Sequence, residues 1–156
     1  MGRAKTRLAA TIGNEAAFEI YKRLLQRTFK VTADLPVDKV VFYDQFVDRN
    51  DFWPNEIYEK EVQSEGELGD KMLNAFNYVF ERGYKRAAII GSDCYDLSPE
   101  FIQDAFEQLK EKDAVIGPSH DGGYYLIGLS KPCEDIFKNK RWSTSSVCLD
   151  TEKDLE

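Results

Sequence analysis

Short apolar segments alternate with amphipathic helical segments along this chain, and this alternation constrains the fold more than any other feature. Helical periodicity is predicted over residues 9–30, 70–81 and 98–112. Four other segments have the length and composition of strands: "DKVVFYD", "KRAAIIGSDC", "DAVIGP" and "GGYYLIGLS". Strands and helices in alternation are typical of a sheet that carries helices on both faces. We therefore expect a three-layer α/β/α domain with a mostly parallel sheet.

The size and charge of the chain exclude several classes of protein. Its 156 residues suit a single domain, which we expect to span residues 1–156. Hydrophobic residues make up 42% and the net charge is −7, so the chain is typical of a globular protein and unsuited to general nucleic-acid binding. We expect no nucleic-acid partner. We also expect no membrane span, because no apolar run approaches the ~20 residues that one requires.

Three cysteines, Cys94, Cys133 and Cys148, are widely spaced and form no CxxC pair. This pattern argues against a disulfide framework and against a zinc site. It favours a reduced, cytoplasmic location.

A basic segment, "GRAKTRLA", precedes the first predicted helix. Arg3, Lys5 and Arg7 alternate along it behind Gly2. Cations ahead of a helix N-terminus suit a phosphate group, by charge and by the unpaired N–H groups of the first turn. A solvated basic tail explains the same residues equally well.

An acidic loop follows the predicted strand in "IIGSDCYDLS". Asp93 comes directly after the strand end, where ligands bind in open α/β sheets, and its carboxylate suits Mg²⁺ or Mn²⁺. The alternative is a turn closed by an aspartate side chain, which fits Asp96 better than Asp93 because Asp96 lies nearer the helix start at Ser98.

A second acidic loop lies in "SHDGGYY". Asp121 is a candidate to orient or deprotonate a hydroxyl, and Gly122 and Gly123 would let a ligand approach the backbone. The alternative is a plain Asp-Gly turn between two strands, and the frequency of such turns favours it.

The C-terminal part offers further candidates. In "RWSTSS", Trp142, Ser143 and Thr144 provide a stacking surface and two hydroxyls for a sugar or base, although Trp142 is equally suited to a core. Asp150 is a candidate second metal ligand, or part of a helix cap. We expect the chain to stop without a closing helix.

Five segments together resemble one known family. They are "GRAKTRLA", "GELGDKM", "IIGSDCYDL", "VIGPSHDGGYYLIGL" and "RWSTSSV". Their order and distances resemble the bacterial rSAM/selenodomain-associated transferases, also called arsenosugar-biosynthesis-type glycosyltransferases. That family is similar in turn to small guanylyltransferases. The resemblance implies a Rossmann-like GT-A fold, that of the nucleotide-diphospho-sugar transferases. Relative to that fold we expect this chain to lack the first strand and to be shortened at both ends.

The resemblance also implies a function. Arg3, Lys5, Arg7 and Asp93 would bind the nucleotide diphosphate, and Asp93 and Asp150 would hold Mg²⁺ or Mn²⁺. Our hypothesis is a metal-dependent glycosyltransferase, and its acceptor side would use the following residues: Asp121 as the catalytic residue, with Gly122, Gly123, Tyr124, Trp142, Ser143 and Thr144 binding the acceptor.

Two alternatives stay open, a nucleotidyltransferase that releases pyrophosphate and a non-catalytic nucleotide-binding domain. The expected partners are a nucleotide sugar and a small-molecule acceptor, and a homodimer also stays open.

Overall fold

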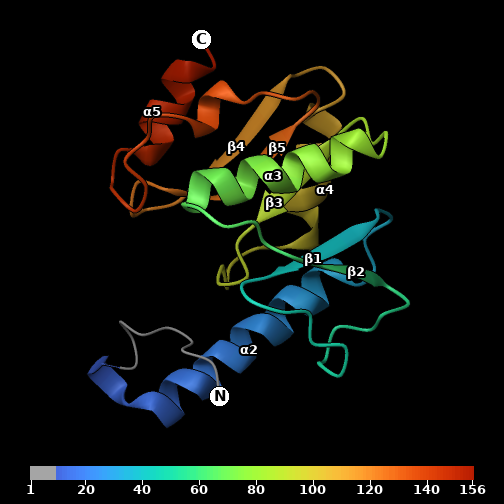
Figure 1. Ribbon diagram of the computed structural model, residues 1–156, viewed down its shortest axis with the longest axis vertical. Helices are drawn as coiled ribbons and strands as arrows, with labels where there is room; N and C mark the ends of the chain where they lie inside the picture. Colours follow the sequence, from blue (N-terminus) through green and yellow to red (C-terminus); the bar gives the residue numbers. More distant parts are fainter. Residues whose placement is uncertain (1–9) are drawn as a thin grey trace.

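The computed structural model describes residues 10–156 of the chain, which form a mixed α/β structure (Figure 1). The elements in chain order are α2 Asn14–Thr32, β1 Lys39–Tyr43, β2 Tyr58–Val62, α3 Leu68–Glu81, β3 Ala87–Ile90, α4 Pro99–Gln108, β4 Ala114–Pro118, β5 Tyr124–Leu129, the 3₁₀ helix η1 Asp135–Phe137 and α5 Val147–Asp154. None of the helices within residues 10–156 combines the length and apolar character needed to cross a bilayer.

The strands form two small sheets. β1 and β2 pair in parallel, whereas the other sheet has the order β3-β5-β4 with both pairings antiparallel. The mostly parallel sheet expected from the sequence is therefore not confirmed. The physical reason is the short turn between β4 and β5, which folds β5 back between its two neighbours. Because β3 and β4 both run against β5, they still point the same way, as two strands joined through a helix commonly do.

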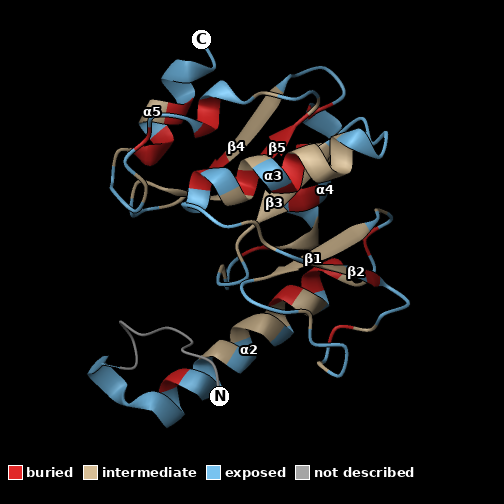
Figure 2. Cartoon of the chain, in the orientation of Figure 1, coloured by how far each residue is buried: buried red, intermediate tan, exposed pale blue. Residues whose placement is uncertain are grey.

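Helices cover both faces of the three-stranded sheet. Ile90 and Leu126 belong to a core cluster with residues of α4, whereas Ile89 and Ile127 belong to a second cluster with residues of α3. Successive residues of a strand point to opposite faces, so this division places α4 and α3 on opposite sides. Figure 2 shows the buried residues concentrated at these contacts.

The helix boundaries differ from the sequence expectation by a few residues. α4 begins at Pro99 after the N-cap Ser98, as predicted, but ends at Gln108 instead of continuing to 112. α3 begins at Leu68 because Glu67 is its N-cap, and Asp70 closes a capping box by accepting the Glu67 N–H at 2.9 Å.

The expectation that the chain stops without a closing helix was wrong, since α5 covers Val147–Asp154. Thr151 is fully buried and its hydroxyl donates to the Val147 carbonyl at 2.8 Å. The Cys148 amide donates to the Gly122 carbonyl at 2.9 Å. The segment is rich in charged residues, so its helix depends on tertiary contacts that the sequence pattern does not reveal.

Candidate functional site

The two acidic loops predicted from the sequence lie at the same edge of the three-stranded sheet. Ile90, at the end of β3, pairs with Leu126, and Pro118, at the end of β4, pairs with Tyr124. Loop 91–98, which follows β3, and loop 119–123, which follows β4, therefore lie at the same end of the sheet. The pairing brings the loops that carry Asp93 and Asp121 together, at the carboxyl ends of β3 and β4, where ligands bind in open α/β sheets.

Loop 119–123 is a hydrogen-bonded turn. The Ser119 amide donates to the Gly123 carbonyl at 3.0 Å, and the Gly122 amide donates to the Ser119 carbonyl at 3.1 Å. The Asp121 carboxylate accepts from the Ser119 hydroxyl at 2.5 Å and from the Gly123 amide at 3.1 Å. The Asp-Gly turn between two strands, which the sequence offered as the alternative to a ligand-binding loop, is thus confirmed. Hydrogen bonds lower the pKa of Asp121, with the Ser119 hydroxyl the larger cause and the Gly123 amide the smaller. The carboxylate therefore stays ionised, and it is better suited to orient a hydroxyl by accepting a hydrogen bond than to act as a base.

Packing against a distant segment of the chain requires a residue without a side chain at position 122. The φ of Gly122 is +85°, and a Cβ placed on it would lie 2.0 Å from the Ser145 carbonyl oxygen. The bare backbone at this position therefore lets segment 145–148 pack against the turn, and the amide of Cys148 completes the contact by donating to the Gly122 carbonyl. At Gly123 the corresponding contacts are ordinary, the nearest at 3.4 Å.

Helix α2 anchors the loop that carries Asp93. The guanidinium of Arg27 donates to the carbonyls of Tyr95 and Leu97, each at 3.1 Å, and lies 5.9 Å from the centre of the Tyr95 ring. The Thr28 hydroxyl approaches the Ser92 carbonyl at 3.3 Å. The loop is therefore attached to the fold on both sides of Asp93, and this position suits a preorganised ligand site.

The expected acceptor residues have different surroundings. Trp142 is half-buried against the α3-side core and packs so closely on α3 that a Cβ at Gly69 would lie 2.6 Å from its ring. Ser143 and Thr144 are exposed, and the Thr144 hydroxyl donates to the Arg141 carbonyl at 2.8 Å. Tyr124 belongs to the α3-side cluster, where burial raises its pKa to about 12 and a hydrogen bond with Thr151 partly opposes this.

The metal-ligand candidates form no closed cage. Asp150 lies on α5, whose first turn contacts the Asp121 loop through Gly122. Within residues 10–156, no three or more His, Cys, Asp or Glu side chains gather as a group that could hold a metal. Arg3, Lys5 and Arg7 lie outside the described residues.

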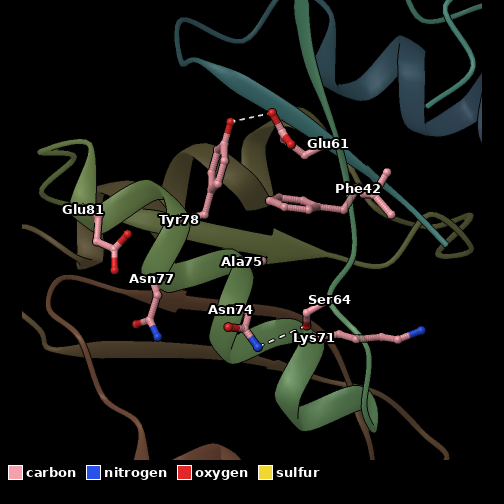
Figure 3. Close-up of a pocket in the computed structure, with 10 residues that line it drawn as sticks. Phe42, Glu61, Ser64, Lys71, Asn74, Ala75, Asn77, Tyr78 and Glu81 are labelled. Carbon is pink, nitrogen blue, oxygen red and sulfur yellow. Dashed lines mark hydrogen bonds between the residues drawn. The ribbon is translucent and has the colours of Figure 1, made fainter. Parts of the chain in front are cut away.

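A hollow of about 340 Å³ lies between α3 and the β1–β2 pair (Figure 3). Phe42 and Tyr78 meet edge to face there with ring centres 5.7 Å apart, and Lys71 at its other end pairs with Asp44 at 3.1 Å. Of the predicted site residues that lie within 10–156, none lines this hollow.

We call the end of the sheet that carries the Asp93 and Asp121 loops the acidic edge. The sequence analysis missed several residues that fix the geometry of these loops. Ser119 donates to Asp121 within the turn, the backbone of Ser145 packs against Gly122, and Arg27 and Thr28 hold the loop of Asp93. The only signal for Ser119 was its place two residues before an Asp-Gly pair, which is typical of a turn. The other three carried no local signal, because their partners lie far away along the chain.

Comparison with known proteins places the chain in a family. Residues 25–144 match the model of DUF2064, described as uncharacterized protein conserved in bacteria. The chain belongs to the DUF2064 family. A solved structure from Desulfovibrio desulfuricans G20, described as a "putative nucleotide-diphospho-sugar transferase", superposes with a TM-score of 0.85 at 34% identity. The match covers 97% of the present chain and 68% of that protein, so this DUF2064 chain spans about two thirds of its solved relative. No curated protein matches the sequence.

Proposed function

We propose that the protein is a glycosyltransferase that moves a sugar from a nucleotide-diphospho-sugar to an acceptor hydroxyl. One observation carries the proposal: the loops of Asp93 and Asp121 lie at the same end of the three-stranded sheet, in a fold shared with the solved relative described above. The finer description, a GT-A domain that uses Mg²⁺ or Mn²⁺, belongs to the same proposal.

Asp93 would act on the donor side. Its loop is held by Arg27 and Thr28, so a carboxylate there meets the diphosphate with little reorganisation. A bound Mg²⁺ or Mn²⁺ would neutralise charge on the leaving diphosphate. Asp150 is the second residue we assign to the cation, and Arg3, Lys5 and Arg7 would add positive charge beside the phosphates.

Asp121 would act on the acceptor side. Its lowered pKa keeps the carboxylate ionised at neutral pH, so it would accept a hydrogen bond from the attacking hydroxyl and fix the direction of attack at the anomeric carbon. The Gly122–Gly123 backbone, Tyr124 and the exposed hydroxyls of Ser143 and Thr144 would line the acceptor position, with Trp142 behind them.

The direct test is a thermal-shift screen of nucleotide sugars with Mg²⁺ or Mn²⁺. A ligand at a hundredfold its Kd stabilises the fold by about 2.7 kcal/mol, a readily measured rise in Tm. Asp93→Ala should abolish the cation-dependent part of that rise. The matched control is Asp96→Ala, an exposed carboxylate in the same loop, which should leave it intact.

The products then decide the reaction. A glycosyltransferase releases a nucleoside diphosphate, whereas pyrophosphate would replace the proposal with a nucleotidyltransferase. Binding without any turnover, across a panel of sugar, phosphate and alcohol acceptors, would make the domain non-catalytic. An unchanged shift in Asp93→Ala would remove this residue from the donor site.

A further inference from the structure

Loop 91–98, between β3 and α4, presents an exposed aromatic ring beside Asp93. Tyr95 follows Asp93 by two residues and is 65% exposed, and among the large apolar side chains of residues 10–156 only Phe46 is more exposed. Single exposed apolar side chains are common on protein surfaces. Tyr95 differs from a scattered surface residue in two respects: it lies at the acidic edge, and α2 fixes its backbone.

Helix α2 holds the backbone of Tyr95 in place. The Arg27 guanidinium donates to the carbonyls of Tyr95 and Leu97, each at 3.1 Å, and Leu97 is buried in the core cluster that includes residues of α4. The same guanidinium lies 5.9 Å from the centre of the Tyr95 ring, within the range of cation–π attraction. The ring therefore has a defined place although most of the residue faces solvent, and a ligand that packs on it would require little reorganisation of the loop.

The carboxylate of Asp93 lies close to the end of β3. A Cβ placed on Gly91 would lie 2.9 Å from the Oδ1 atom of Asp93, and the Gly91 amide donates to the Tyr125 carbonyl at 3.1 Å, which continues the pairing with β5. Tyr95 follows Asp93 by two residues, which span at most about 7 Å of extended chain. When one group of a ligand is bound at the Asp93 carboxylate, the next group of that ligand is therefore within reach of the Tyr95 ring.

In the proposed donor, the group next to the bound phosphate is the sugar. The sugar of a nucleotide-diphospho-sugar is bonded directly to the β-phosphate, whereas the α-phosphate and the ribose separate the base from that phosphate. Because we assign Asp93 to the diphosphate, the sugar would lie beside the Asp93 loop. A pyranose ring carries C–H groups on its faces, which suit the apolar face of an aromatic ring, and its hydroxyls at the rim stay accessible to polar partners.

We propose that Tyr95 is a specificity-determining residue whose ring packs against the sugar of the nucleotide-diphospho-sugar. This inference rests on the proposed function, and it adds a residue that the sequence analysis assigned to neither the donor nor the acceptor. The ring favours neutral hexopyranoses, which offer an open C–H face, over sugars with a charged group on that face. The Arg27 hydrogen bonds end on backbone carbonyls, so the loop that carries Asp93 keeps them when the ring is removed.

The test uses calorimetry with Mg²⁺ or Mn²⁺ and compares ligands with and without the sugar: UDP with UDP-glucose, ADP with ADP-glucose and GDP with GDP-mannose. Tyr95→Ala should weaken binding of the nucleotide sugar about five- to tenfold and leave binding of the nucleoside diphosphate unchanged, because only the sugar contacts the ring. Tyr95→Phe keeps the ring and should bind both ligands as the unaltered protein does.

Phe18→Ala is the matched control. Phe18 is an aromatic residue of α2 that is 41% exposed, and it lies about 14 Å along the helix axis from Arg27, in the half of α2 that extends away from the sheets (Figure 1). This variant should bind both ligands as the unaltered protein does. The Tm of each variant without ligand verifies that it is folded.

Weaker binding of the nucleotide sugar alone, seen in Tyr95→Ala and absent in the other two variants, supports the proposal. Equal weakening of both ligands would show that Tyr95 acts through the geometry of the loop, and unchanged binding of both would show no contact with the donor; either result overturns it. A loss in Tyr95→Phe as large as in Tyr95→Ala would assign the contact to the hydroxyl and overturn packing on the ring. If the unaltered protein binds no ligand of any pair, the proposed function itself fails, and the role of Tyr95 fails with it.

Discussion

At the scale of single residues, the acidic edge depends on side chains that fix loop geometry as well as on the carboxylates themselves. Gly122 leaves room for the backbone of Ser145, and Arg27 ties the loop of Asp93 to α2. Arg27 is not among the residues that we propose to contact a ligand. Each of these two residues fixes where a carboxylate lies, so substitutions at these positions separate folding of the loops from chemistry at the site.

Gly122→Ala should destabilise the fold by roughly 2–4 kcal/mol, because it combines a left-handed backbone with a clash against Ser145. Gly123→Ala is the matched control and should cost less than about 1 kcal/mol, since its new Cβ makes only ordinary contacts. Urea unfolding measures both. Equal stability of the two variants would show that the 145–148 segment does not pack as described.

Arg27→Ala should loosen loop 92–97, because two hydrogen bonds to its carbonyls are lost. We expect faster amide exchange in that loop and a loss of stability of about 1 kcal/mol. Arg23→Ala, at an exposed position on the same helix, serves as the control. If exchange in the loop rises equally in both variants, the effect belongs to α2 as a whole and Arg27 has no positioning role.

At the scale of elements, α3 and α5 both begin where the sequence pattern did not place a helix start, and contacts at their N-termini set these starts. α3 begins at Leu68 because Glu67 and Asp70 satisfy each other's backbone amides. α5 forms because Val147, Cys148 and Thr151 are buried together, although most of its other residues are exposed. A helix can thus begin where a local side chain satisfies its free amides, or where packing compensates for a weak pattern.

Asp70→Ala should cost about 1 kcal/mol of stability, because the capping box loses its return hydrogen bond. Asp104→Ala removes an exposed carboxylate of α4 that accepts from exposed Gln108, and should change stability far less. Chemical denaturation of the two variants provides the comparison. A smaller loss in Asp70→Ala than in Asp104→Ala would contradict the role of the capping box.

At the scale of the whole molecule, buried tyrosines make the stability of the fold depend on pH, and aromatic rings connect α2 with β2. Tyr43, Tyr58 and Tyr124 have raised pKa values, with burial the largest cause in each, and that of Tyr124 reaches about 12. Phe29, Trp53 and Tyr58 additionally pack ring against ring between α2 and β2, with each pair of ring centres no more than 6.1 Å apart.

These raised pKa values predict an alkaline limit to stability. A phenol whose pKa is raised on folding contributes stability that is fully present below its ordinary pKa of 10.0 and is lost as the pH rises through the folded value. Urea midpoints should therefore fall between pH 10 and 12. Tyr124→Phe should reduce the fall in urea midpoint between pH 10 and 12. Below pH 9 the midpoints of this variant should change with pH as those of the unaltered protein do. A flat profile up to pH 12 in the unaltered protein would refute the prediction.

The sequence by itself determined strands β1, β3, β4 and β5, helices α2, α3 and α4, the two acidic loops and the Asp-Gly turn, because periodicity, capping residues and turn chemistry act over a few neighbouring residues. Only the tertiary structure decided that β5 folds back between β3 and β4, that Gly122 lies against Ser145 and that Val147–Asp154 form α5. Those features depend on contacts between segments far apart along the chain. A local pattern cannot encode them, since the same apolar run suits a parallel or an antiparallel partner.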